Sequence, residues 1–218
     1  MSDIYISGIC LYGNIKEIRS KYYTYATEIS PLNLSKELKI KYYAGAKENA
    51  ILYNCYQLLI NKYPDIKNIE NERFGICASS TYGLKTIQEY YNELLQNNIS
   101  NQFVFRQTAN NLLSTLLCIN MNKICYATTV IDPISMGKNA LEVAQLMMQA
   151  QKFKYVLVAS VNCHNNNYIS GMVVLSTNKE AKYSRLIFDK IDSKRFKTDI
   201  GTVGAIYAIS NILEEEAL

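Results

Sequence analysis

Residues 124–151 read ICYATTVIDPISMGKNALEVAQLMMQAQ, and this stretch decides the fold. Its first part, Ile124–Val130, is apolar and rich in β-branched residues, which predicts a buried strand. Asp132 and Pro133 break that strand, and a helix is expected over Gly137–Gln151. A strand, a sharp turn and a helix in direct succession form an elbow. Such an elbow lifts a side chain to a helix N-terminus, where the helix dipole and free amides favour an anion.

The helix expected within this stretch is apolar on nearly every side. Its apolar residues are Ala140, Leu141, Val143, Ala144, Leu146, Met147, Met148 and Ala150. A helix of this kind is buried on all sides, yet one sheet can cover only one face of it. We therefore expect the other face to meet a partner surface.

The rest of the chain alternates between strand and helix patterns. We expect strands at 4–11, 74–78, 155–161, 169–175 and 204–209, helices at 35–63, 86–95 and 108–121, a turn at 79–83, and polar loops at 96–102 and 162–167. This alternation predicts an α/β fold whose sheet is mostly parallel with an antiparallel edge. A length of 218 residues fits a single domain over residues 1–218.

Composition excludes several classes of function. The net charge of the chain is only +4, and the Lys and Arg residues are scattered along the sequence, so no nucleic-acid partner is expected. No apolar run is long enough to span a membrane and the N-terminus lacks a signal peptide, which predicts a cytoplasmic protein. The six cysteines form no CxxC pair, which favours reduced structural thiols. One histidine cannot build a zinc site and no glycine-rich phosphate loop is present, so neither a metal nor a cofactor is expected.

The expected elbow has no cysteine at its turn, because Cys125 lies inside the strand. Ser135 is the only hydroxyl near the start of the helix, and a nucleophilic serine needs a base. The only histidine, His164, falls in an expected surface loop, and Asp132 before a proline is typical of a turn. These observations favour Ser135 as a helix N-cap and leave a nucleophilic Ser135 as the alternative.

Several segments match known motifs in the right order. Ile6-Ser7-Gly8-Ile9 is similar to ITGIG, Phe74–Thr86 to GVxxGSGIGGLET, Asn110 to the asparagine of PNM, Tyr126–Ala144 to YAIVTACTTGxHAIGEA, Tyr155–Ser160 to VMVAGG, Leu175–Asn178 to ALSTRN, and Phe188–Lys190 to PFDKDRDGF. These are motifs of β-ketoacyl synthases, and the chain resembles the N-terminal half of that family, within the thiolase-like superfamily. The resemblance implies a thiolase-like half-fold, with a mixed, mostly parallel sheet flanked by helices.

The chain departs from the family at the positions that carry the chemistry. When the motifs are aligned back from Gly137 and Ala140, the catalytic cysteine of the family falls on Ile134, so the elbow residues Asp132, Pro133, Ile134, Ser135 and Gly137 include no thiol. The family's GEGAG turn is altered to DIGTVG at 199–204, and the half that bears its other catalytic residues is absent from this sequence. We therefore expect no condensing chemistry from this chain alone.

The resemblance extends to chain-length factors, which lack the active cysteine and pair with a working ketosynthase, and in particular to the short versions in aryl polyene and flexirubin-type pathways. It implies a heterodimer with a full-length β-ketoacyl synthase, formed by antiparallel pairing of the strand that carries Ile124, Tyr126, Thr128 and Val130. It also implies that four side chains lie near the growing acyl chain and set product length: Tyr82, Phe103, Phe105 and Thr108. Plain core packing is the alternative for these four.

Two other functions remain open from the sequence. One is a homodimeric binding or regulatory protein with a thiolase fold. The other is an acyltransferase that depends on Ser135. The sequence also leaves open the acyl chain length and whether an acyl carrier protein contacts this chain.

Overall fold

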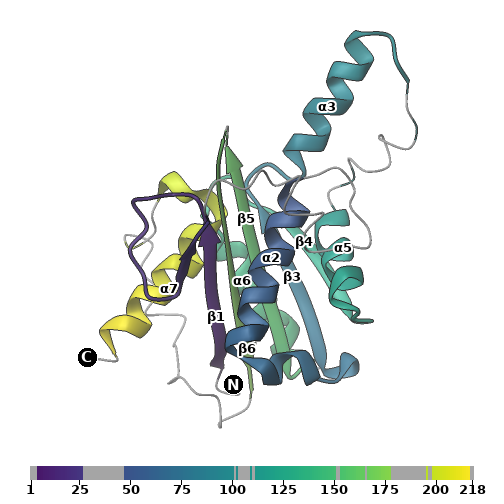
Figure 1. Cartoon of the computed structure of the whole chain (residues 1–218). Coiled ribbons are helices and arrows are strands. Elements are labelled where there is room, and N and C mark those ends of the chain that lie inside the picture. Colours follow the sequence, from purple (N-terminus) through teal and green to yellow (C-terminus); the bar gives the residue numbers. More distant parts are fainter. Residues whose placement is uncertain are drawn as a thin grey trace.

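The structure is a computed structural model of the 218-residue chain, and it describes residues 4–26, 47–100, 111–150, 153–164, 166–177 and 198–216, with the single residues Gln102, Ala109 and Arg195. Strands of this part form one sheet in the order β2–β1–β6–β5–β3–β4 (Figure 1). Their bounds are β1 Tyr5–Gly13, β2 Tyr23–Tyr25, β3 Phe74–Ser80, β4 Tyr126–Ile131, β5 Tyr155–His164 and β6 Asn167–Ser176.

The sheet is mixed, as expected, but its antiparallel strand is internal. The pairs β1–β2, β3–β4 and β3–β5 are parallel, whereas β6 is antiparallel to both of its neighbours, β1 and β5. The prediction of an antiparallel edge is therefore wrong. The reason is local: β5 and β6 form a hairpin, in which His164 pairs with Asn167, and a turn this short forces the chain to run back beside itself.

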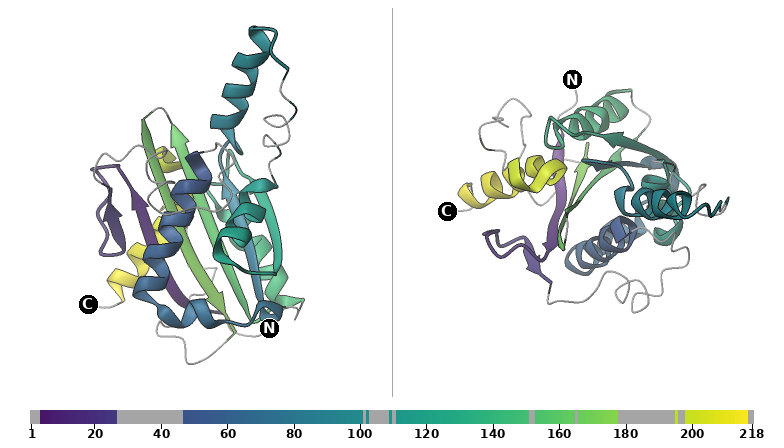
Figure 2. Two further views of the ribbon diagram at one scale, coloured as in Figure 1. Left: turned by 45° about the vertical axis from the view of Figure 1, so that its right-hand side comes forward. Right: turned by 90° about the horizontal axis from the view of Figure 1, so that it is seen from above.

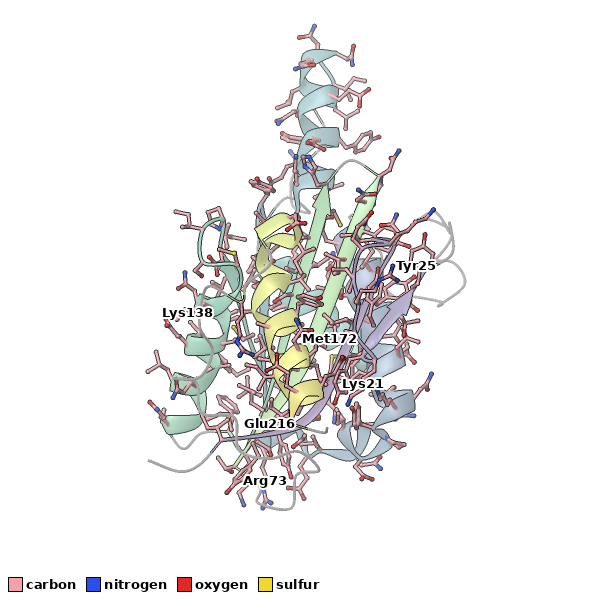
Figure 3. The ribbon with its side chains drawn as sticks, turned by 90° about the vertical axis from the view of Figure 1, so that its left-hand side faces the viewer. Lys21, Tyr25, Arg73, Lys138, Met172 and Glu216 are labelled. Atoms are coloured by element: carbon pink, nitrogen blue, oxygen red, sulfur yellow. The ribbon has the colours of Figure 1, made fainter. Side chains whose placement is uncertain are left out.

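Helices cover both faces of the sheet. Their bounds are α2 Lys47–Lys62, α3 Lys85–Gln96, α5 Leu112–Met121, α6 Lys138–Gln149 and α7 Gly204–Glu215, with short 3₁₀ helices η1 Pro64–Asn68, η2 Asn71–Arg73 and η5 Thr198–Val203. Helices α2 and α5 lie on one face, and α6 and α7 on the other (Figure 2). Figure 3 shows α6, which begins at Lys138, and α7 on the face turned to the viewer. Helix α3 projects beyond the end of the sheet (Figure 1).

Two hydrophobic cores result from this layering. Successive residues of a strand point to opposite faces, so on β5 Leu157 joins the core beneath α2 and α5, while Val156 and Val158 join the core beneath α6 and α7. Every residue of β3 is buried, which agrees with its place inside the sheet. The central strands are thus fixed from both sides.

Several expected boundaries shift by a few residues. The helix expected from Ser35 is described from Lys47 onward and ends at Lys62, just before Pro64, while its expected start lies outside the described residues. The turn expected at 79–83 begins only at 81, because Ser79 and Ser80 continue β3. The loop expected at 162–167 is mostly strand, since β5 continues to residue 164 and β6 begins at residue 167.

The strand expected over 204–209 is wrong, because these residues begin helix α7. The short window GAIYAI is β-branched enough to suggest a strand. Its apolar positions nevertheless continue at helical spacing, through Ala205, Ile206, Ile209, Ile212 and Leu213, and all five are buried. One face of α7 therefore packs on the sheet, and a strand there would have sent half of this set to solvent.

Strand β4 differs from the expected buried strand. It is the edge strand of the sheet, with β3 as its only neighbour in the described part of the chain, and its residues are half-buried or exposed. Helix α6 was expected to be buried on all sides. In this chain only one face is buried, through Ala140, Leu141, Ala144 and Met148, while Leu146 is 63% exposed. The opposite face of α6 is open in the single chain.

Candidate functional site at the carboxyl ends of the parallel strands

Three parallel strands, β3, β4 and β5, end at the same edge of the sheet. In open α/β sheets this edge is where ligands and reactive groups are usually placed. Here it carries the turn after β3, the elbow 131–138 after β4, and the end of β5. The segment 200–205, which leads into α7, crosses the same edge. It contacts the turn after β3, the elbow and the end of β5.

The elbow is built around the carboxylate of Asp132, which is 1% exposed. The backbone N–H of Ser135 donates to its Oδ1 at 2.8 Å, and the N–H of Gly137 donates to its Oδ2 at 3.0 Å. The Ser135 hydroxyl also donates to Oδ2. Both carboxylate oxygens thus accept hydrogen bonds from within the turn.

The turn closes through two residues with positive φ, Met136 at 55° and Gly137 at 92°. The Met136 carbonyl accepts a hydrogen bond from the N–H of Ala205 at 2.9 Å. A Cβ added at Gly137 would lie 2.0 Å from the carbonyl oxygen of Thr202. Only glycine allows so close an approach at this φ, so the elbow is docked tightly against the segment that leads into α7.

A second set of contacts joins the turn after β3 and the end of β5 to the same segment. The N–H of Thr202 donates to Thr81 Oγ1 at 3.2 Å, and the Thr202 hydroxyl donates to the carbonyl of Val161 at 3.2 Å. Both threonines are buried. The carboxyl ends of the three strands therefore form one rigid assembly.

Ile134 lies at the tip of the elbow and is 84% exposed. It is preceded by Pro133, which is also exposed. The position at which the resemblance expects a cysteine is thus held by a bare aliphatic side chain, which has no lone pair and cannot form a thioester.

Ser135 makes side-chain hydrogen bonds at the start of α6. Its Oγ accepts the backbone N–H of Asn139 at 3.2 Å, while its hydroxyl donates to Asp132. The cap residue of α6 is Gly137, so the predicted N-cap position is wrong, although the serine hydroxyl does satisfy an N–H of the first turn. The amides of 135 and 137, which could have bound an oxyanion, already donate to Asp132. His164 is exposed at the end of β5.

Three of the four expected interface residues lie on β4, at the free edge of the sheet, whereas Ile124 lies in the loop before it, because the strand begins at Tyr126 and not at residue 124. Ile124 is 87% exposed and Tyr126 is 57% exposed, whereas Thr128 and Val130 are half-buried. The Tyr126 ring packs beside that of Phe153, with centroids 5.8 Å apart. An edge strand with apolar side chains offers unpaired backbone groups to another strand.

Of the four residues expected near the growing acyl chain, the structure describes only Tyr82. Tyr82 lies in the turn after β3 and is 53% exposed, with the ammonium of Lys85 5.2 Å from the centre of its ring. Phe103, Phe105 and Thr108 lie outside the described residues. Their position relative to Tyr82 stays a prediction.

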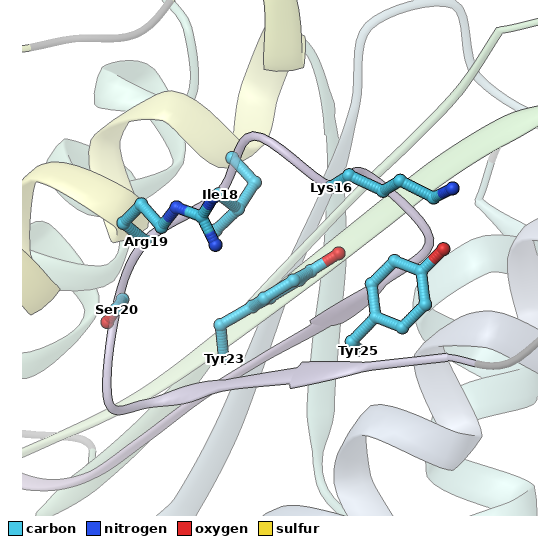
Figure 4. Close-up of a pocket in the computed structure, with 6 residues that line it drawn as sticks. All are labelled: Lys16, Ile18, Arg19, Ser20, Tyr23 and Tyr25. Atoms are coloured by element: carbon cyan, nitrogen blue, oxygen red, sulfur yellow. The ribbon is translucent and has the colours of Figure 1, made fainter.

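Two surface cavities have no lining residue from the elbow. The larger, of about 530 Å³, is lined by Lys16, Ile18, Arg19, Ser20, Tyr23 and Tyr25. Figure 4 shows Tyr23 and Tyr25 projecting from β2 toward the loop that carries the two basic side chains. Burial raises the pKa of Tyr23 to about 12, and its hydroxyl donates to the carbonyl of Ile15 at 3.1 Å. The smaller cavity, of about 210 Å³, is lined in part by Asn162, His164 and Asp199.

Within the described ranges, no cluster of three His, Cys, Asp or Glu side chains could hold a metal ion. Across the same ranges, no helix has the length and apolar character that a membrane crossing requires.

Sequence reasoning missed two features, one at this edge and one at the amino end of β4. The contact between Thr81 and Thr202 joins residues 121 positions apart and has no local signal. The second feature is a pair of thiols, Cys118 and Cys125, whose sulfurs lie 3.6 Å apart. A cysteine at each side of an expected helix end could have revealed this pair.

No family model matches the sequence, and no curated protein matches it significantly. Solved structures do match in fold. A chain of the complex of the ketosynthase ApeO with its chain length factor ApeC, from Xenorhabdus doucetiae, aligns over 84% of this chain and 82% of that chain, with a TM-score of 0.59 and 11% identity. The two shares are nearly equal, so that chain has about the same length as this one.

Two further structures agree. The ishigamide ketosynthase/chain length factor aligns with a TM-score of 0.58 and 10% identity, over 80% of this chain and 58% of the matched chain. The complex AntDE:AntF, a type II polyketide synthase ketosynthase with its acyl-carrier protein, aligns with a TM-score of 0.59 and 11% identity, over 81% and 63%. This chain thus spans less than two thirds of these two matched chains. Their likeness nevertheless shows that this chain has the fold of ketosynthase and chain-length-factor chains.

Proposed function

We propose that this protein is a non-catalytic, chain-length-factor-like subunit that pairs with an active β-ketoacyl synthase in polyketide- or polyene-type chain elongation. The observation that carries the proposal is an intact elbow with Ile134 at its tip. The turn, its buried carboxylate and its docking on the segment before α7 are all present. The sulfur atom that would accept an acyl group is absent, because Ile134 stands at its position.

The local chemistry supports a loss of catalysis. Acyl transfer needs a nucleophile, a base and donors for the oxyanion. At this elbow the amides of Ser135 and Gly137 already donate to Asp132, and the serine hydroxyl does the same. A serine held in this way donates its hydroxyl hydrogen bond to a carboxylate that is itself needed to hold the turn. These contacts do not favour a Ser135-dependent acyltransferase.

The exposed apolar surface supports a protein partner. Ile124 just before β4, Tyr126 at the free edge of the sheet, Ile134 at the elbow and Leu146 on the open face of α6 are each more than half exposed. Burying one such side chain contributes about 2 kcal/mol. In the proposed complex a partner strand pairs in antiparallel fashion along 124–130, with Thr128 and Val130 in the same contact, and the rest of the partner surface covers Ile134 and Leu146.

The names of the similar structures supply the class of partner. ApeO with ApeC and the ishigamide protein are ketosynthase and chain-length-factor complexes, and AntDE:AntF contains an acyl-carrier protein. We therefore place a full-length ketosynthase opposite β4, with an acyl carrier protein as a further partner of the complex. As part of the same proposal, the complex works in the cytoplasm, in agreement with the six free cysteines.

The decisive experiment is native mass spectrometry of the tagged chain purified from its own host. The proposal expects one copy of this chain bound to one ketosynthase, identified by its peptides. The complex is then incubated with a labelled acyl thioester, and the label is expected on a cysteine of the ketosynthase only. A lone homodimer would contradict the proposal, as would a label on this chain that disappears in Ser135→Ala.

The role in product length concerns Tyr82, Phe103, Phe105 and Thr108, which we propose lie near the growing chain. Tyr82→Ala is the sharpest variant, because this side chain is 53% exposed and contributes little to the fold of the free subunit. The complex is expected to make a different range of chain lengths at unchanged turnover. Tyr90→Ala, at a side chain that is 49% exposed, is the matched control. An unchanged range of products with Tyr82→Ala would refute this role for Tyr82.

A further inference from the structure

The connection between α5 and β4 brings two cysteines together. Helix α5 ends at Met121, and Asn122 follows in the left-handed conformation with φ 56° and ψ 42°. The carbonyl of Cys118 accepts the N–H of Lys123 at 2.9 Å, which stops the helix and reverses the chain. Cys125 thereby returns beside Cys118, and their sulfurs lie 3.6 Å apart.

The environments of the two sulfurs differ. Cys125 is half-buried, whereas Cys118 is 7% exposed and packs in the core beneath α5. The contact between the two sulfurs, together with the nearby Lys123 ammonium, lowers the pKa of Cys125. The same contact and burial raise the pKa of Cys118. Cys125 is thus suited to be the attacking thiolate and Cys118 the resolving thiol.

The Lys123 ammonium is held near this pair by the backbone. Its Nζ donates to the carbonyl oxygens of Lys67 and Ile69, in the segment before β3. Those contacts fix a positive charge beside the loop, where it attracts a thiolate at Cys125.

A second pair of thiols provides a contrast within the same chain. Cys10 and Cys55 also interact, and the contact with Cys55 lowers the pKa of Cys10. These residues are 4% and 0% exposed. A dissolved oxidant cannot reach their sulfurs while the protein is folded. The two pairs of thiols therefore differ in how accessible their sulfurs are to a dissolved oxidant.

We propose that Cys118 and Cys125 form a redox-active dithiol that reacts with low-molecular-weight disulfides. The Cys125 thiolate attacks one sulfur of the disulfide, forming a mixed disulfide and expelling one thiolate. Cys118 then loses its proton and attacks the Cys125 sulfur, which forms the Cys118–Cys125 bond and expels the second thiolate. The protein loses two electrons and two protons, and the small disulfide is reduced to two thiols.

The Cys118–Cys125 disulfide would restrain the segment that leads into the edge strand β4. The disulfide would close the loop 118–125, which contains Ile124 and directly precedes β4. This inference concerns the free chain and does not depend on the proposed ketosynthase partner.

The test uses the full chain, purified alone in reduced form and incubated with glutathione disulfide before alkylation. Peptide mass mapping is expected to find the Cys118–Cys125 bond, with the loss of two hydrogen atoms and no retained glutathione. Cleavage after Lys123 separates the two cysteines, so the bond appears as a linked peptide pair. Cys10 and Cys55 are expected to stay reduced. A wild-type chain whose disulfides are absent, or spread over the other cysteines, overturns the proposal.

Variants separate the two roles. In Cys118→Ser, or in Cys118→Ala if the serine variant is unstable, the mixed disulfide cannot be resolved, so glutathione is expected to remain on Cys125. In Cys125→Ser, modification of Cys118 is expected to be at least about tenfold slower. Cys163→Ser is the matched control and is expected to oxidise like the wild type, because burial raises the pKa of the Cys163 thiol. Loss of the disulfide in Cys163→Ser, or no adduct on Cys125 in the Cys118 variants, would overturn the assignment.

Discussion

The Asp132→Asn substitution tests whether the carboxylate holds the elbow. The change keeps the size of the side chain but replaces one acceptor oxygen with an NH2 group. Oδ1 receives the Ser135 N–H at 2.8 Å, and Oδ2 receives the Gly137 N–H at 3.0 Å and the Ser135 hydroxyl. An amide has only one oxygen for these donors, so at least one donor loses its acceptor. The hydrogen bonds that remain are weaker, because the acceptor is no longer charged.

The expected destabilisation follows from these contacts. A bond to a buried charged group contributes about 2 kcal/mol, and an unsatisfied buried donor costs about 1–3 kcal/mol. We expect the free energy of unfolding to fall by about 3 kcal/mol. For a chain of this length that corresponds to a decrease in Tm of roughly 6–12 °C. Ser135→Ala is expected to cost about 1 kcal/mol, since it removes one of the same contacts.

Urea unfolding followed by circular dichroism measures these changes. Asp65→Asn, at an exposed position in η1, is the control and is expected to stay within about 0.5 kcal/mol of the wild type. Because residues 132 and 135 share a bond, the double variant should depart from additivity by at least about 0.5 kcal/mol. An Asp132→Asn chain as stable as the control would refute our account of the elbow.

Three further predictions concern the interface, the turn and the thiols. Ile124→Ser should leave the stability of the free chain nearly unchanged. It should weaken binding to the proposed ketosynthase partner about 30-fold, measured by surface plasmon resonance, because about 2 kcal/mol of apolar burial is lost. Tyr25→Ser, at the opposite edge of the sheet, is the control and should leave the affinity unchanged. Gly137→Ala should lower the free energy of unfolding by about 2 kcal/mol or more in urea titration, because its Cβ would meet a carbonyl oxygen at 2.0 Å. The Cys118–Cys125 disulfide, which closes an eight-residue loop, should raise the free energy of unfolding by about 2 kcal/mol in calorimetry with and without reductant.

The predictable parts of the fold are those with local signals. The strands β3 and β5 are continuous apolar runs bounded by turn residues, and the break at Asp132 and Pro133 marks the elbow. The role of Asp132 was also predictable, because its hydrogen-bond partners lie only three and five residues away. Local chemistry of this kind can be inferred from the sequence alone.

What could not be predicted depends on neighbours distant in the sequence. An apolar β-branched run such as β4 is compatible with a central or an edge position, and only the strand order decides between them. The first residues of α7 have the same ambiguity, since the small, β-branched and aromatic residues of GAIYAI fit either a strand or a helix. The helical alternative prevails because the apolar spacing continues to Leu213 and covers the sheet.

The elbow also explains why such a turn can persist without a nucleophile. Its backbone strain lies at Met136 and Gly137, two and three residues after Ile134, and not at the tip. Those residues are held by Ala205 and by close contact with Thr202, so the turn joins β4 and α6 to α7. If the turn relaxed, the edge strand would lose its anchor at the carboxyl end. The geometry at this site therefore preserves the surface that we propose binds a partner, and the aliphatic side chain of Ile134 leaves that surface intact.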